Sequence, residues 1–175
     1  MVLIGVLNKL KEVLWSFRGA LLVQVQSLGL WQGRQFRQYR AFSGTGITLQ
    51  LRFQATKPFI LSDQRLYIDD GIAQVRVLTG ATPSGTWTNT ATQQGKNRYS
   101  AEALAYVQGN FMQAGGTFTG GTERELFRAD AGGGQGIAYS NIDANVRVLP
   151  AGDYYFEIVL TGQTAGIYSF EWEEL

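Results

Sequence analysis

Carboxylates are the most numerous side chains of this chain that can do acid–base chemistry, since it contains 14 aspartates and glutamates. The sequence contains no histidine and no cysteine, so the commonest general base, the commonest metal ligand and the thiolate nucleophile are absent. The glutamates at positions 157, 171, 173 and 174 can supply paired carboxylates for glycoside hydrolysis, since Glu171 and Glu173 share a strand face. Solvated charges near a chain end are far more common, so we expect a protein that is not an enzyme.

The aspartates are typical of turns and do not form a metal-binding motif. Six of them lie beside predicted turns: Asp63, Asp69, Asp70, Asp130, Asp143 and Asp153. Aspartate in a turn normally hydrogen bonds to its own backbone, and the regular Asp-x-Asp-x-Asp-Gly calcium loop is missing. We therefore expect no metal and no cofactor.

Two glycine-rich segments, residues 115–122 and 131–136, resemble phosphate-binding loops only in composition. Neither segment ends in Gly-Lys-Ser/Thr, so neither is a P-loop. We expect the glycines instead to adopt positive φ values or to let neighbouring chains approach closely. Phe111, Met112 and Phe118 lie in or beside the first segment. We interpret residues 109–122 as a long loop that offers these side chains to a partner, and a loop folded onto its own body is the alternative.

Basic and aromatic residues alternate in the run RQFRQYR at positions 34–40. The spacing of three places Arg34, Arg37 and Arg40 together only in a helix or a polyproline segment. Our preferred interpretation is a basic stripe that contacts an acidic protein surface. A solvated strand and a nucleic acid site, in which phosphates bind arginine and bases stack on aromatic rings, are the alternatives.

The first 33 residues lie outside the pattern of the rest. Apolar residues recur there at spacings of three and four, which predicts an apolar helix followed by a loop. We expect this arm to attach the protein to a partner through Val6, Leu10, Leu14 and Trp15, with packing on its own body as the alternative. It shows no convincing secretion signal, and no stretch reaches the roughly 18 apolar residues of a membrane span.

From residue 36 onward apolar and polar residues alternate, as in Ile47, Leu49, Leu51 and Phe53. Further strands are expected at 58–62, 65–68, 72–79, 86–91, 124–129, 145–149, 153–160 and 167–172, with one helix at 100–108. We expect an all-β fold over residues 34–175, an antiparallel two-sheet sandwich that is jelly-roll-like in preference to immunoglobulin-like. Asp69-Asp-Gly71 predicts a hairpin, and the last two strands should also pair as a hairpin.

Charge is scarce and unevenly distributed. Charged residues make up 17% of the chain, below the roughly 25% of an average soluble domain. Residues 1–57 hold eight basic and one acidic residue, and residues 58–175 hold seven basic and thirteen acidic residues, which gives net charges of 8 − 1 = +7 and 7 − 13 = −6. Such a dipole favours contact with another copy or an acidic partner, and neutralisation within the chain is the alternative. The low charge also predicts a homo-oligomer, because a protein partner can cover apolar surface.

Four segments together resemble virion proteins of tailed bacteriophages: YRAF at 39–42, FILSDQRLYIDDG at 59–71, TGATPSGTW at 79–87 and GKNR at 95–98. The resemblance covers roughly residues 36–130. It implies a β-sandwich structural subunit of the capsid decoration or cement type, with no catalytic residues. Together with the frequent use of jelly rolls in virions, the resemblance also favours a trimer as the homo-oligomer.

The leading hypothesis is therefore a virion subunit that stabilises the capsid by binding the major capsid protein or another virion protein. A tail, fibre-base or head–tail adaptor subunit is the first alternative. The second is a carbohydrate-binding module that stacks sugars on Trp31, Trp87 or Trp172.

Overall fold

The computed structural model describes residues 32–91, 93–94, 104–131, 135–139 and 147–175. The predicted arm, with Val6, Leu10, Leu14 and Trp15, therefore lies outside the described residues, apart from its last two positions. Of the helix expected at 100–108, residues 104 and 105 are helical, residues 106–108 are not, and the rest lies outside the described part.

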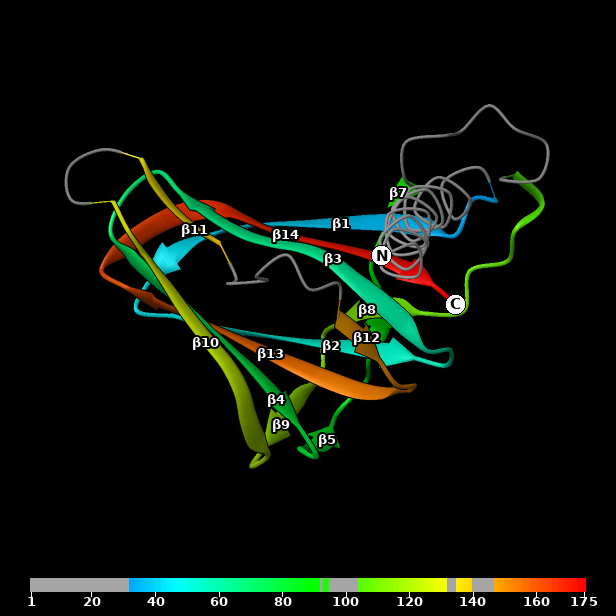
Figure 1. Cartoon of the computed structure of the whole chain (residues 1–175). Helices are drawn as coiled ribbons and strands as arrows, with labels where there is room; N and C mark the ends of the chain where they lie inside the picture. The colour runs from blue at the N-terminus through cyan, green and yellow to red at the C-terminus, as the bar shows by residue number, and fades with distance from the viewer. Residues whose placement is uncertain (1–31, 92, 95–103, 132–134, 140–146) are drawn as a thin grey trace, which may run out of the picture.

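The described chain folds into two large antiparallel sheets (Figure 1). Sheet A contains β1 (Gln35–Thr45), β3 (Phe59–Ile68), β7 (Gln93–Gln94), β11 (Gly136–Tyr139), β12 (Arg147–Leu149) and β14 (Gln163–Glu174). Sheet B contains β2 (Thr48–Ala55), β4 (Ile72–Thr79), β6 (Thr88–Asn89), β8 (Phe111–Ala114), β10 (Thr122–Asp130) and β13 (Gly152–Thr161). A small third sheet pairs β5 (Thr82–Ser84) with β9 (Thr117–Thr119). The all-β, antiparallel two-sheet prediction is confirmed.

The order of the strands is that of a jelly roll. The path β11-β3-β14-β1 crosses sheet A, and the path β10-β4-β13-β2 crosses sheet B. Strands from the first half of the chain pair with strands from the second half: β1 with β14, β2 with β13, β3 with β11 and β4 with β10. Such pairing arises when one long antiparallel ribbon folds over into two sheets. The result is the jelly roll, a double-sheet architecture with two Greek keys.

Both predicted hairpins are wrong, because the strands that follow one another lie in different sheets. β3 and β4, joined at Asp69-Asp-Gly71, belong to sheets A and B, and β13 and β14 are divided in the same way. The turns themselves are present: Gly71 has a φ of 70° and its N–H donates to Asp70 Oδ1 at 2.7 Å. Turn residues show where the chain reverses direction. They do not show which strands pair, because the paired strands here are distant in the sequence.

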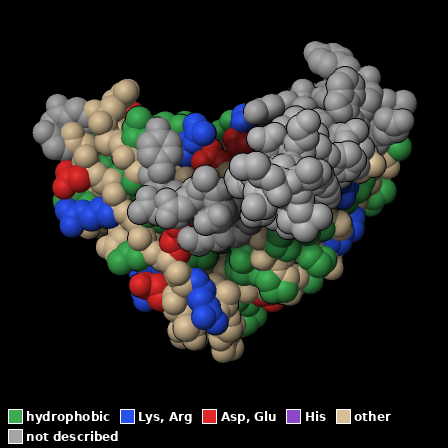
Figure 2. Space-filling model, in the orientation of Figure 1, with side chains coloured by type: hydrophobic (Ala, Val, Ile, Leu, Met, Phe, Trp, Pro, Cys, Tyr) green, Lys and Arg blue, Asp and Glu red, His purple; other side chains and the backbone are tan. Residues whose placement is uncertain are grey.

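The outward positions of sheet B are mostly polar or charged. Arg76 on β4 binds Glu123 of β10 and Glu157 of β13, both at 2.8 Å. Charged side chains of both signs are visible along β10 and β4 in Figure 2. This outer face is therefore suited to contact with water.

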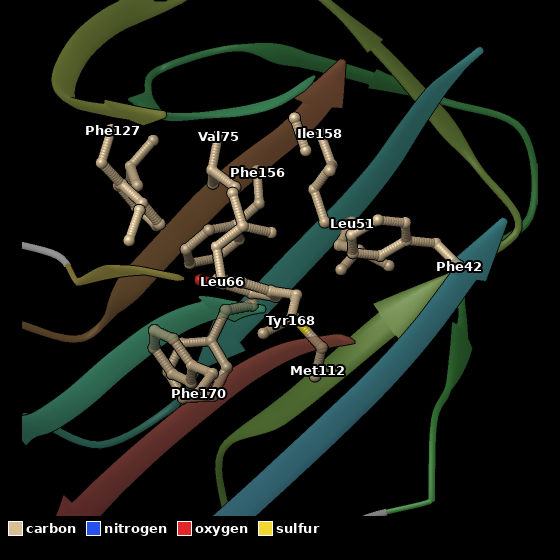
Figure 3. Close-up of a cluster of buried hydrophobic side chains, with 14 of the residues drawn as sticks. Phe42, Leu51, Leu66, Val75, Met112, Phe127, Phe156, Ile158, Tyr168 and Phe170 are labelled. Carbon is tan, nitrogen blue, oxygen red and sulfur yellow. The ribbon is translucent and has the colours of Figure 1, made fainter. Parts of the chain in front are cut away.

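The core lies between the two sheets, and aromatic rings link them. Phe53 of β2 is fully buried, and its ring centroid lies 5.0 Å from Phe59, 4.9 Å from Phe170 and 4.9 Å from Trp172. Figure 3 shows Leu66, Tyr168 and Phe170 of sheet A facing Val75, Phe156 and Ile158 of sheet B. Rings at these separations add to the stabilisation from burial.

A second, smaller core forms outside sheet B, where the β5–β9 pair folds over it. Phe118 of β9 is 5% exposed, and its ring lies 5.0 Å from that of Tyr155 on β13, next to Leu78. Trp87 packs against this cluster, and a Cβ on Gly116 would come within 2.3 Å of its ring. The expected loop at 109–122 is thus two strands, β8 and β9, joined by glycines.

The buried tyrosines predict loss of stability in alkali. Burial, together with the charge of Glu125, raises the pKa of Tyr168 well above its ordinary value of 10.0. Because the folded pKa is the higher one, this contribution to stability is complete below pH 10.0 and is lost as pH rises above it. The free energy of unfolding from urea titrations should fall between about pH 10 and 11, and fall less steeply in Tyr168→Phe. An equal decline in both proteins would contradict this assignment.

Candidate interaction surface

A continuous apolar row crosses the outer face of sheet A. Ile137 of β11 is in register with Tyr67 of β3, Tyr67 with Ile167 of β14, and Ile167 with Ala41 of β1. Ile137 is 49% exposed and Ile167 is 43% exposed. These residues point outward because their neighbours along each strand, such as Leu66 and Tyr168, point into the core. An apolar row across four strands is a candidate protein contact.

Aromatic and charged residues border this row on one side. Tyr39, 42% exposed, follows on β1, with the Arg37 guanidinium 5.5 Å from its ring centroid. Ion pairs follow, between Arg37 and Glu171 and between Arg65 and Asp63 at 2.5 Å. An apolar centre with a charged border is typical of protein interfaces.

The apolar row is not among the surfaces predicted from the sequence. The sequence does indicate it in part. Tyr67 and Ile167 are large apolar residues at outward-facing positions, in strands whose inward-facing positions are also apolar. Ile167 begins the predicted strand 167–172, in which Tyr168, Phe170 and Trp172 occupy the inward positions. What the sequence lacks is the strand order that aligns the row.

The predicted basic stripe is wrong, because it requires a helix or a polyproline segment, whereas residues 35–40 belong to strand β1. Alternation places Arg37 on the outer face of β1, opposite to Arg34 and Arg40. Arg34 binds Glu173 at 3.4 Å, and Arg37 binds Glu171. Arg40 is exposed and forms no ion pair with the described residues. A partner-binding role stays a prediction for Arg40.

Phe111, Met112 and Phe118 are committed to this chain's own fold. Met112 is 1% exposed in the main core, Phe118 lies in the second core, and Phe111 is half-buried on β8. The prediction that they reach a partner is wrong for Met112 and Phe118, since both side chains are already covered. Phe118 occupies the single buried position of β9, whereas in β8 the adjacent residues Met112 and Gln113 are both buried.

The glutamates considered for catalysis are bound by basic residues and backbone. Glu174 is fully buried, and its carboxylate accepts hydrogen bonds from the N–H groups of Gly109 and Asn110, at 3.0 and 2.7 Å, from the Lys57 ammonium at 3.2 Å and from the Tyr106 hydroxyl at 3.0 Å. Hydrogen bonds to Tyr106 and Glu174 raise the pKa of Lys57 above its ordinary value. This carboxylate ties residues 106–110 to the end of β14.

Ion pairs within the chain neutralise much of the charge asymmetry. Four basic residues of the first 57 bind acidic residues of the last 25: Arg34 with Glu173, Arg37 with Glu171, Arg52 with Asp153, and Lys57 with Glu174. Arg37 and Glu171 lie on the paired strands β1 and β14, and Arg52 and Asp153 lie on the paired strands β2 and β13. Arg34 immediately precedes β1, and Lys57 follows β2. The asymmetry therefore reflects strand pairing.

A cavity of about 320 Å³ opens between the sheets near β12 and the start of β13. It is lined mainly by apolar side chains, among them Phe59, Leu61, Val77, Leu149, Tyr154 and Phe156. The buried Gln64 accepts a hydrogen bond from Tyr168 at 2.7 Å and donates to Glu125 at 3.4 Å. The polar groups at this cavity are thus held in a structural network.

Metal and sugar sites find no support in the described part of the chain. No three acidic side chains there lie close enough to hold a metal ion. Trp172 is 1% exposed in the core, so it presents no ring face to a sugar, and Trp87 is half-buried with Gly116 against its ring. Trp31 and Asp143 lie outside the described residues. No helix in the described ranges is long and apolar enough to cross a membrane.

No family model matches the sequence, and no curated protein matches it. Among solved structures, two similar chains come from T=1 particles derived from infectious bursal virus and from a mutant VP2 protein of infectious bursal disease virus. Each is 11% identical and aligns over 81% of this chain and 40% of its own length, with TM-scores of 0.17 and 0.16. This chain thus spans less than half of those proteins, and the likeness is too slight to support a function.

Proposed function

We propose that this chain is a non-enzymatic structural subunit of a bacteriophage virion, a capsid decoration or cement protein that stabilises the shell through protein contacts. The observation that carries the proposal is the apolar row Ile137, Tyr67, Ile167 and Ala41 on the outer face of sheet A. Exposed apolar surface of this kind is stabilised when a protein partner covers it.

Two further observations support this proposal. The jelly roll is an architecture that viral shells use repeatedly, although a fold alone does not define a function. The segments that resemble tailed-phage virion proteins also fall largely within the described body, on β1, β3 and the residues between β4 and β6.

The carboxylates favour a structural role over catalysis. Glu171, Glu173 and Glu174 are each bound by a basic residue from β1, its approach or the turn after β2. A glycosidase needs two carboxyl groups that face a bound sugar across a cleft. The arrangement seen here joins strands and leaves no such pair exposed.

A tail, fibre-base or head–tail adaptor subunit is the alternative within the virion, because the same apolar row would serve any assembly. The two roles differ in copy number: decoration requires hundreds of copies per particle, and a tail component requires about a dozen. A carbohydrate-binding module is less favoured, because Trp172 is buried in the core and Trp87 is partly buried against the second core.

Replacing Ile167 with Asn should weaken assembly without unfolding the protein. Ile167 is 43% exposed, so the change should alter the free energy of unfolding by less than about 1 kcal/mol. Binding to particles that lack the protein should fall about tenfold in co-sedimentation, as expected for a central contact. Leu126→Asn is the matched control, because Leu126 is 51% exposed on sheet B. Equal loss of binding in both variants, or in neither, would contradict a role for sheet A.

A further inference from the structure

Within the described part of the chain, the outer edge of β1 is open over most of its length. β1 pairs with β14 from Gln35 to Thr45, but on its other side β7 pairs only with Phe36 and Arg37. Among the described strands, none covers residues 38–45 on that side. In an antiparallel strand alternate residues direct their N–H and C=O groups to either side. This stretch therefore presents backbone donors and acceptors that no described strand pairs, although the Tyr39 C=O accepts a hydrogen bond from Gln38 Nε2 at 2.9 Å.

This edge also lacks the protection found at the edge of the other sheet. β10, the edge strand of sheet B, carries Glu123, Arg124, Glu125, Arg128 and Asp130. Charges of this density discourage an added strand. Residues 38–45 of β1 have the sequence QYRAFSGT, in which the only charge is Arg40.

Arg40 stands in a cleft beside this open edge. The cleft has a volume of about 290 Å³ and is lined by Arg40, by residues 48–51 of β2 and by residues 114–117. Arg34 and Arg37 bind Glu173 and Glu171, but Arg40 has no acidic partner among the described residues. An exposed guanidinium beside free backbone groups suits a carboxylate carried on an extended chain.

We propose that the edge of β1 at residues 38–45 binds an extended segment of a partner polypeptide as an added strand, and that Arg40 binds an acidic side chain of that segment. Backbone hydrogen bonds supply affinity in strand addition, and the side-chain cleft supplies specificity. This site lies at the edge of sheet A and is distinct from the apolar row on its face. It does not depend on the chain's being a virion protein.

The test uses amide hydrogen exchange of the full-length chain with a synthetic peptide. The probe is a seven-residue strand peptide of alternating Thr and Val with a central Glu, and its control has Gln at the centre. At about millimolar peptide, alternate amides of residues 38–45 should exchange about tenfold more slowly. The Glu peptide should bind about two- to fivefold more tightly than the Gln peptide. Arg40→Gln should abolish that preference and keep the protection, and Arg124→Gln should change neither.

Three results would overturn the proposal. In the first, the peptide protects no amide of β1, or protects only another edge. In the second, the Glu preference survives in Arg40→Gln, which would place the acidic side chain elsewhere. In the third, these amides are already protected in the free chain by self-association, with a dimer in light scattering, which would assign the edge to a second copy.

Discussion

Replacing Phe53 with Ala should lower the free energy of unfolding by about 3–5 kcal/mol, a loss typical of a large aromatic ring removed from a packed core. Phe53 is fully buried on sheet B and contacts Phe59, Phe170 and Trp172, all on sheet A. Its removal leaves a cavity at the point where the two sheets are joined. Because whole domains are stable by only about 5–15 kcal/mol, the variant should be close to unfolded at 37 °C.

Urea unfolding followed by circular dichroism measures this loss directly. Phe53→Leu should cost less than Phe53→Ala, because most of the buried volume is retained. Tyr39→Ala is a surface control, since Tyr39 is 42% exposed and makes no contact in the core clusters. A loss below about 1 kcal/mol for Phe53→Ala would mean that the sheets do not pack as described.

Removing the Glu174 carboxylate should have the second large effect. In Glu174→Ala the N–H groups of Gly109 and Asn110 lose their acceptor, and Asn110 is itself fully buried. Each unsatisfied buried donor costs about 1–3 kcal/mol, so the free energy of unfolding should fall by about 2–4 kcal/mol. Lys57 adds less to this cost, because its side chain is 37% exposed and can be hydrated.

The location of the damage distinguishes this network from a general loss of stability. Amides of residues 109 and 110 should lose protection from hydrogen exchange in Glu174→Ala before the core strands do, because the carboxylate ties them to β14. Glu123→Ala is the control, since Glu123 is 41% exposed and binds Arg76 at the surface. If the two variants lose equal stability, the carboxylate has no special role.

The sequence predicts individual strands better than their partners. The alternation of Leu49, Leu51 and Phe53 is local, so β2 follows from a period of two. The pairing of β1 with β14 joins residues more than a hundred positions apart, and no local pattern encodes it. The error at Asp69-Asp-Gly71 has the same origin, because a turn with positive φ serves a hairpin and a sheet crossing equally well.

The candidate site shows the same limit. A single stripe of Arg34, Arg37 and Arg40 requires a period of three, whereas the strand buries Phe36, Gln38 and Phe42 at even spacings. The glycines around Phe118 predict a loop, whereas its burial depends on the distant Tyr155. Ion pairs and apolar rows across a sheet become visible only when the strand order is known.

Quantifying the protein in purified phage particles tests the proposed function most directly. Mass spectrometry with isotope-labelled standard peptides, normalised to the major capsid protein, gives copies per particle. A capsid decoration role predicts hundreds of copies per particle. In particles made with Ile167→Asn, both the number of copies and the stability of the shell should fall. A count near a dozen would move the protein to the tail or the head–tail junction, and its absence from particles would contradict a virion role altogether.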